Sequence, residues 1–352
     1  MKPEDLVRPE ILALRAYHVP AARGMVKLDA MENPYGLPDD LRRELAERLS
    51  SVALNRYPEA DPGELKAALA RRMDVPPGME VMLGNGSDEL IQIMALALAR
   101  PGASMMYPSP TFVMYSMSAA FTGMKPMPVP LREDFSLDAD GFIARMRESR
   151  PALVFIAYPN NPTGALYPEE EVAAIVRAAP GLVVVDEAYH AFAGSTFMAR
   201  LSEFGNLAVL RTMSKLGLAG IRLGYLAARP EWIQEFNKVR PPYNIGVLTQ
   251  AAALFVLEHL EVLEEQAKRI RADRGELSDA LGRFAGVRVF DSKANFVLLR
   301  VPDADRAFAA LCRQGVLVKN LNSPALRNCL RITVGTSEEN RILIAAMKEA
   351  LE

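Results

Sequence analysis

Lys215 is the residue best suited to covalent chemistry, and it lies in the stretch RTMSKLGLAGIRLGY (211–225). The residues just before it, NLAVL (206–210), form a short apolar run typical of a buried strand. A surface lysine more usually lies on the polar face of a helix, whereas this one is expected to follow a strand. A lysine held in a partly dry crevice shifts toward its neutral, nucleophilic form. The pattern therefore predicts a reactive amine at Lys215.

A carboxylate is expected in the same crevice. Asp186 ends the strongly apolar run in VVVDEAYHAF (183–192). A carboxylate in such a place is costly to bury unless a cation faces it. The alternative is that Asp186 simply caps a following helix, and the aspartate alone does not decide between the two.

Hydroxyl and guanidinium groups surround the lysine along the chain. Thr212, Ser214 and Arg222 supply two hydroxyls and one guanidinium. This set suits a phosphate dianion, because the guanidinium offers a planar fork of donors and the hydroxyls add further hydrogen bonds. We therefore expect a phosphate group beside Lys215.

Two further polar clusters also follow apolar runs. GNGSDE (84–89) precedes a helical pattern, so the main-chain N–H groups of Ser87 and Asp88 are expected at the positive end of a helix, where a phosphate binds well. An ordinary helix cap explains this cluster equally well, and the GK[ST] ending of a Walker loop is missing. YPNNPTG (158–164), with Asn161, has the residues of an ordinary turn.

These clusters share one predicted location. Ligands of parallel sheets collect at the carboxyl ends of the strands. Pyridoxal 5'-phosphate needs a lysine for its aldehyde, a carboxylate on its pyridinium nitrogen and a phosphate cradle. Each cluster is a weak signal by itself, but their joint order along the chain predicts this cofactor.

The elements that position these residues alternate between short apolar runs and amphipathic helices. Helical spacing of apolar residues covers 39–50 and 62–73. Alternation of this kind predicts βαβ units and an α/β fold with a mostly parallel, doubly wound sheet. The predicted strands are Glu80–Leu83, Ala103–Tyr107, Leu153–Ala157, Leu182–Asp186, Leu207–Leu210 and Leu223–Ala227.

The pattern changes near RPPYNIG (240–246), which is a proline and glycine break. A long helical stretch follows over 247–283. After it come the strand patterns GVRVF, ANFVLL, GVLVK and LRITVG, which predict a smaller α+β domain. We therefore expect an N-terminal arm with part of the small domain over 1–30, a large cofactor-binding domain over 31–244 and a small domain over 245–352.

Composition excludes several classes of function. The chain has 352 residues, 50% of them hydrophobic, and a formal net charge of −2 without a basic stripe, so nucleic acid is not an expected partner. Its apolar runs of about ten residues are too short to span a bilayer. Three histidines without metal spacing predict no metal site. Two cysteines without CxxC spacing, and no secretory signal, predict a reducing, cytoplasmic location.

The motifs NNPTG, DEAY, the Lys215 to Arg222 segment and LRITVG, in this order, resemble the fold-type I pyridoxal-phosphate aminotransferases over nearly the whole chain. Within them, AYHVP, LDAMENPYG, NRYP, GNGSDELI, PTFVMY and CLRITVGT are most similar to the histidinol-phosphate aminotransferases. The spacing from Lys215 to Arg222 is seven residues, where the family often has eight.

The resemblance implies roles in cofactor binding. Lys215 would join the cofactor's aldehyde and move the substrate's proton, while Asp186 would bind the pyridine nitrogen. Hydrogen bonds to the phenolic oxygen would come from Asn161 and Tyr189, and Phe112 would stack on the ring. The phosphate would be held by Ser87, Asp88, Thr212, Ser214 and Arg222, and by Tyr57 of a second subunit, which implies a homodimer.

The resemblance also implies substrate-binding residues. Arg331 in CLRITVGT would hold the anionic end of the substrate, and Tyr17 in AYHVP would close over its phosphate. Many relatives have a second arginine near Lys319, which offers a point charge instead of a fork. The segment LDAMENPYG departs from the usual LNANENP at Asp29 and Met31.

The activity implied by this resemblance is a ping-pong amino transfer. The amino group would pass between L-histidinol phosphate and 2-oxoglutarate, giving imidazole acetol phosphate and L-glutamate in histidine biosynthesis. Two alternatives keep the cofactor and change the substrate: an aromatic amino-acid aminotransferase and a threonine-phosphate decarboxylase.

Overall fold

The larger half of the chain is organised around a seven-stranded sheet. The computed structural model describes residues 1–14, 16 and 22–351. Within these residues the strand order of this sheet is β2-β8-β7-β6-β5-β3-β4, and β8 is antiparallel to both of its neighbours while the pairs from β7 to β4 are parallel. This confirms the mostly parallel sheet. The strands are β2 (Glu80–Asn85), β3 (Ser104–Ser109), β4 (Lys125–Pro130), β5 (Leu153–Ala157), β6 (Leu182–Asp186), β7 (Leu207–Thr212) and β8 (Leu223–Ala228).

Helices cover both faces of this sheet, which explains why its central strands are continuously apolar. In β6, Val183 and Val185 pack in one hydrophobic cluster, while Leu182 and Val184 pack in another on the opposite face. The helices of this half are α2 (Asp39–Ser50), α3 (Gly63–Arg72), α4 (Ser87–Leu98), α5 (Val113–Thr122), α6 (Ala139–Ser149), α7 (Glu169–Ala178), α8 (His190–Ala193) and α9 (Pro230–Asn237).

The sequence patterns did not predict strand β4. Its sequence, KPMPVP, has proline at every second position, and proline cannot donate to a ladder of hydrogen bonds. The strand occurs at the edge of the sheet, paired only with β3 among the described strands, where this loss is tolerated.

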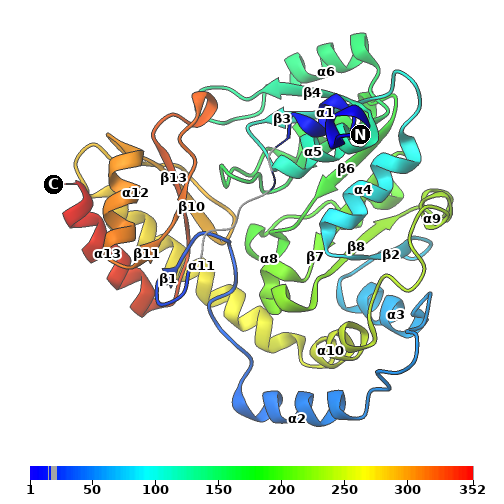
Figure 1. Cartoon of the computed structure of the whole chain (residues 1–352), viewed down its shortest axis with the longest axis horizontal. Coiled ribbons are helices and arrows are strands. Elements are labelled where there is room, and N and C mark those ends of the chain that lie inside the picture. The colour runs from blue at the N-terminus through cyan, green and yellow to red at the C-terminus, as the bar shows by residue number, and fades with distance from the viewer. Residues whose placement is uncertain (15, 17–21, 352) are drawn as a thin grey trace.

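A smaller antiparallel sheet lies in the C-terminal part, in the order β12-β13-β10-β9. Helices α12 (Ala304–Arg313) and α13 (Ser337–Leu351) pack against each other on this side of the molecule (Figure 1). The N-terminal strand β1 (Val26–Lys27) pairs in parallel with β11 (Val316–Leu317). The four strands of the sheet are β9 (Arg288–Val289), β10 (Phe296–Arg300), β12 (Lys319–Asn320) and β13 (Cys329–Thr333).

The helical stretch predicted over 247–283 consists of two helices, α10 (Val247–Glu258) and α11 (Leu260–Gly282), separated at His259. Helix α10 contacts α2 and α3, whereas α11 contacts α8 and also α13 and β10 of the smaller half. In Figure 1, α11 runs between the two halves. We therefore propose that the division between the two domains falls along α11 and not at residue 245.

The N-terminal segment contacts both halves. Helix α1 (Pro9–Leu12) packs on α5, and the Arg8 guanidinium donates to the Phe121 carbonyl over 2.6 Å. Farther along, β1 joins the smaller half. Among the described residues, no helix is both long and apolar enough to cross a bilayer. Short helical turns complete the chain: η1 (Pro3–Asp5), η2 (Met198–Ser202), η3 (Ser214–Leu218), η4 (Ala219–Ile221) and η5 (Pro324–Leu326).

Candidate active site

One cavity brings together most of the predicted site residues. It lies where the parallel strands of the large sheet end, because its lining follows β2, β5, β6 and β7 in sequence. The predicted residues that line it are Ser87, Asp88, Phe112, Asn161, Asp186, Tyr189, Thr212, Ser214, Lys215 and Arg222. We call it the central cavity.

Lys215 is the second residue of the turn that follows β7. Residues Ser214–Leu218 form a π-helical turn that is kinked at Gly217, whose φ of 149° is non-helical. The Lys215 Nζ donates a hydrogen bond to the Ala30 carbonyl over 3.0 Å. Burial, with the charge of Arg331 next, lowers the pKa of this amine from 10.5 to about 8. A substantial fraction is therefore neutral near pH 8, as a nucleophile or base requires.

Asp186 is buried and 4% exposed at the end of β6. Its Oδ2 accepts from the Tyr115 hydroxyl over 2.7 Å, and its Oδ1 accepts from the Ala188 N–H over 3.1 Å. Burial raises the pKa of this carboxyl to about 6, while the two hydrogen bonds act in the opposite direction. The group is therefore mostly ionised at neutral pH.

A cradle of donors lies at the N-terminus of α4. Gly86 precedes the helix with a φ of 77°, and a Cβ there would lie 2.5 Å from the Arg222 Nη2. The Arg222 Nη1 donates to the Ser214 Oγ over 3.2 Å, and the Thr212 hydroxyl donates to the same oxygen over 3.0 Å. Hydroxyls, a guanidinium and a helix N-terminus thus converge, which is the donor set of a phosphate site.

Asp88 contributes a side chain to this cradle as well as its main chain. Its Oδ2 lies 3.5 Å from the Arg222 Nη2, and burial raises the pKa of the Asp88 carboxyl. Arg222 follows the tight turn η4 and adopts a left-handed φ of 52°. With the seven-residue spacing, Arg222 still donates a hydrogen bond to Ser214.

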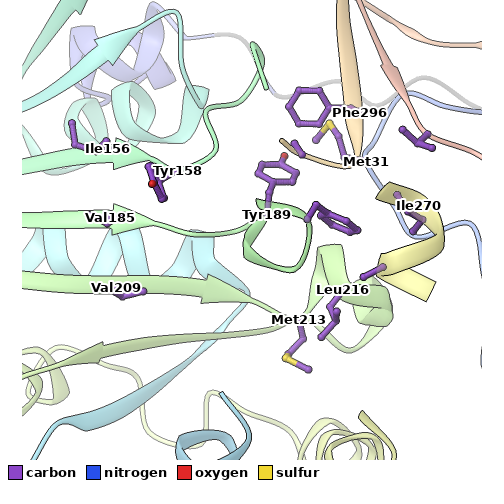
Figure 2. Close-up of a cluster of buried hydrophobic side chains, with 14 of the residues drawn as sticks. Met31, Ile156, Tyr158, Val185, Tyr189, Val209, Met213, Leu216, Ile270 and Phe296 are labelled. Atoms are coloured by element: carbon purple, nitrogen blue, oxygen red, sulfur yellow. The ribbon is translucent and has the colours of Figure 1, made fainter. Parts of the chain in front are cut away.

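Phe112, Asn161 and Tyr189 form other parts of the wall. Phe112 precedes α5, and its ring meets the Tyr115 ring edge-on at 5.7 Å between centroids. Tyr189 follows β6 and points toward Phe296 of the smaller half, at 5.2 Å between ring centroids (Figure 2). Asn161 uses its Oδ1 to accept from the Arg331 Nη1 over 2.6 Å.

Arg331 is buried in the middle of β13, whereas most arginines lie at the protein surface. Its Nη2 donates to the Asp29 carbonyl over 2.8 Å. Lys319 of β12 is the direct cross-strand neighbour of Arg331, so the two cationic side chains project from the same face, about 5 Å apart at Cβ. The predicted anion-binding pair is therefore adjacent, next to Asn161 of the central cavity.

Among the described residues, three predicted site residues do not line the central cavity: Arg331, Lys319 and Tyr57. Tyr57 is 81% exposed, and its ring stacks on that of Tyr243 at 4.7 Å between centroids. Tyr17 lies outside the described residues.

The chain matches the sequence profile of the family Aminotransferase class I and II over residues 23–347. It belongs to this family.

Close relatives have full-length similarity to this aminotransferase. Histidinol-phosphate aminotransferase 2 of Cupriavidus pinatubonensis is 55% identical, with 99% of this chain and 97% of that protein covered. Histidinol-phosphate aminotransferase of Chromobacterium violaceum is 56% identical, with 98% of each covered. The crystal structure of histidinol-phosphate aminotransferase from Sinorhizobium meliloti in complex with pyridoxal-5'-phosphate has a TM-score of 0.87 and 25% identity, covering 98% of this chain and 97% of that one.

Class I and II aminotransferases depend on pyridoxal 5'-phosphate, and the central cavity of this aminotransferase fits that group. It contains an amine of lowered pKa in Lys215 and a buried carboxylate in Asp186. The phosphate fits the cradle at α4, where the space left by the missing Cβ of Gly86 is filled by the Arg222 guanidinium. The donor set therefore matches the aldehyde, ring nitrogen and phosphate of the cofactor.

Sequence reasoning missed three contributors to the site of this aminotransferase. Met31 lines the central cavity with a left-handed φ of 53°, and Ala30 offers its carbonyl to Lys215. Tyr115 holds Asp186, and its position three residues after Phe112 in PTFVMY was the available signal, since both fall on one side of the helix start. No pattern in the sequence could show that the main chain at Ala30 meets a lysine 185 positions away.

Proposed function

We propose that this chain transfers the amino group between L-histidinol phosphate and 2-oxoglutarate, giving imidazole acetol phosphate and L-glutamate. One observation carries the proposal: a cationic pair, Arg331 and Lys319, lies next to the central cavity. Arg331 donates a hydrogen bond to Asn161, which lines that cavity. Relatives that are 55% and 56% identical over nearly the full length carry the name histidinol-phosphate aminotransferase, which supports the same substrate.

When bound, pyridoxal 5'-phosphate supplies an aldehyde that carries the amino group between the substrates and a ring that accepts the electrons released at the substrate Cα. Lys215 would hold the aldehyde carbon and take up and return the proton at Cα, because the pKa of its amine, about 8, leaves part of it neutral. Asp186 would hold the ring nitrogen in its protonated state. Ser87, Ser214 and Arg222 would bind the phosphate.

Arg331 would bind the anionic end of both substrates. A guanidinium forms paired hydrogen bonds with a carboxylate or with a phosphate, so one residue serves glutamate and histidinol phosphate in turn. Lys319, partly buried beside it, adds a charge that a phosphate dianion uses more than a single carboxylate does. This difference favours a phosphorylated substrate over an aromatic amino acid.

We also propose that the working unit is a homodimer. Tyr57 is 81% exposed and stacks on Tyr243, so a second copy could receive it without unfolding any element of the first. Tyr57 of the second copy would then donate its hydroxyl to the cofactor phosphate, as the family resemblance implies.

The substrate proposal is tested with L-glutamate as the donor and three acceptors: imidazole acetol phosphate, its unphosphorylated counterpart and phenylpyruvate. We expect the phosphorylated acceptor to have a kcat/KM about a hundredfold higher than the unphosphorylated one, because charge-assisted hydrogen bonds are lost with the phosphate. Formation of 2-oxoglutarate is the measured product. A preference for phenylpyruvate would overturn the substrate assignment, and release of carbon dioxide from O-phospho-L-threonine would instead identify a decarboxylase.

A further inference from the structure

Tyr115 is a fully buried tyrosine whose hydroxyl contacts the catalytic carboxylate. It lies in the first turn of α5, and its hydroxyl donates to the Asp186 Oδ2 over 2.7 Å. Its ring stacks on Phe155 with centroids 4.5 Å apart and planes 9° apart, while the Phe112 ring meets it edge-on at 88°. Because aromatic rings contact it on two sides, the hydroxyl has little freedom to leave Asp186.

Asp186 accepts one hydrogen bond on each of its oxygens, from Tyr115 on Oδ2 and from the Ala188 N–H on Oδ1. These two donors fix the rotation of the carboxylate about its Cβ–Cγ bond. Each oxygen still has a lone pair available for a further donor. A buried carboxylate that lost one of its two donors would bear a large desolvation cost and would favour its protonated form.

We propose that Tyr115 is a positioning residue for this reaction: its hydroxyl orients the Asp186 carboxylate toward the ring nitrogen of the cofactor and keeps it ionised at the working pH. This inference rests on the proposed function, which assigns the ring nitrogen to Asp186. Tyr115 does not itself react with substrate or cofactor. It acts through the charge and orientation of its neighbour.

The charges around Asp186 explain why a donor is needed there. Burial is the largest cause of its raised pKa, and the nearby carboxylates of Asp88 and Glu187 raise it further. Tyr167 and Tyr189 also act on the pKa of Tyr115, and Lys215 and Arg222 line the same cavity. Burial raises the pKa of Tyr115 itself well above its usual value, so its hydroxyl remains a neutral donor over the whole range in which Asp186 titrates.

The test compares Tyr115→Phe with Tyr107→Phe. Tyr107 is a suitable control because it is also buried, its ring lies 6.0 Å from that of Tyr115, and its hydroxyl faces Ser116. Binding of pyridoxal 5'-phosphate is titrated by absorbance between about pH 6 and about pH 8.5, and the Asp186 carboxyl of the apoprotein is titrated by carbon-13 NMR.

For Tyr115→Phe we expect the dissociation constant of the cofactor to rise on the order of tenfold near pH 7, as loss of a hydrogen bond to a charged group predicts. The loss should shrink toward the alkaline end, where Asp186 is ionised in both proteins, and the NMR titration of Asp186 should move to higher pH. Tyr107→Phe should follow the wild type in both measurements.

Unchanged cofactor binding and an unchanged Asp186 titration in Tyr115→Phe would overturn the proposal, as would a loss that is equal at every pH. If the variant does not fold, 3-fluorotyrosine in place of Tyr115 provides the second measurement. Its more acidic hydroxyl should move the Asp186 titration to lower pH, and no movement would contradict the inference. Failure of the wild type to bind the cofactor would refute the proposed function instead, because the apoprotein titration tests the hydrogen bond separately.

Discussion

The two sides of the central cavity are built in different ways. The cofactor side, defined as the residues after β2, β5, β6 and β7, is carried by the ends of strands in one sheet. The substrate side, defined as Arg331, Lys319 and the segment 29–31, is assembled from distant parts of the chain. A sheet fixes the first side through its own hydrogen-bonded register, whereas the second depends on contacts between segments about 300 residues apart.

The segment 29–31 connects the two sides. The Ala30 carbonyl accepts from Lys215, and the Asp29 carbonyl accepts from Arg331. The Met31 N–H donates to the Thr333 Oγ1 over 2.9 Å, and its carbonyl accepts from the Asn295 amide over 2.9 Å. Main-chain atoms of this segment therefore link the amine that would perform the chemistry to the arginine that would hold the substrate.

The largest effect is expected from removing the reactive amine of the cofactor side. Lys215→Ala should lower turnover by on the order of 10⁴-fold or more, because in the proposed function both the covalent attachment and the proton transfer would depend on this nitrogen. Treatment of the wild-type holoenzyme with borohydride should fix the cofactor to Lys215, as peptide mass spectrometry can show. Turnover in the variant near the wild-type rate, or borohydride labelling at another lysine, would contradict the assignment.

The fold was predictable where periodicity is strong. The strands over 153–157 and 182–186 occur at the predicted bounds, because both are continuously apolar and both faces are covered by helices. The prolines of β4 concealed an edge strand, and the helical pattern over 247–283 did not reveal the break at His259. Helices α10 and α11 pack against different elements, and helical periodicity does not indicate that difference.

The candidate site was predictable to the extent that it follows strand ends. Asp186, Thr212, Ser214 and Lys215 could be assigned to one crevice because parallel strands end at the same edge of a sheet. Tyr115 was not assigned to this crevice, because a tyrosine in an apolar helix is first expected to be a core residue and its spacing from Phe112 is only a weak signal. The adjacency of Arg331 and Lys319 depends on the register of β12 against β13, which no sequence pattern specified.

A smaller effect, confined to the substrate side, is expected from Arg331→Ala. It should lower kcat/KM for both glutamate and the phosphorylated substrate by about a thousandfold, because a buried hydrogen-bonded charge is lost. Binding of the cofactor should change little, and its absorbance spectrum is the control. Arg331→Lys keeps the charge and loses the planar fork, so its kcat/KM should fall between those of the wild type and Arg331→Ala. An effect on only one substrate would show that the two do not share this arginine.

The smallest effect concerns the stability of the apoprotein and returns to the cofactor side. The pKa of Asp186 is raised from 3.8 to about 6, so the folded state binds its proton more tightly than the unfolded chain does. The contribution of this group to stability is therefore complete below about pH 4 and is lost as pH rises through about 6. Asp186→Asn lacks a titrating group and should not show this loss.

Between about pH 4 and about pH 7 we expect Asp186→Asn to gain up to about 3 kcal/mol of unfolding free energy relative to the wild type. Urea unfolding of both apoproteins at the two pH values measures this difference in unfolding free energy. Glu187→Gln is an unsuitable control, because Glu187 pairs with the buried Arg211 over 2.8 Å. Exposed Asp134→Asn is the better reference for the same chemical change. If the difference in unfolding free energy between variant and wild type is the same at both pH values, burial does not raise the pKa of Asp186 and this prediction is wrong.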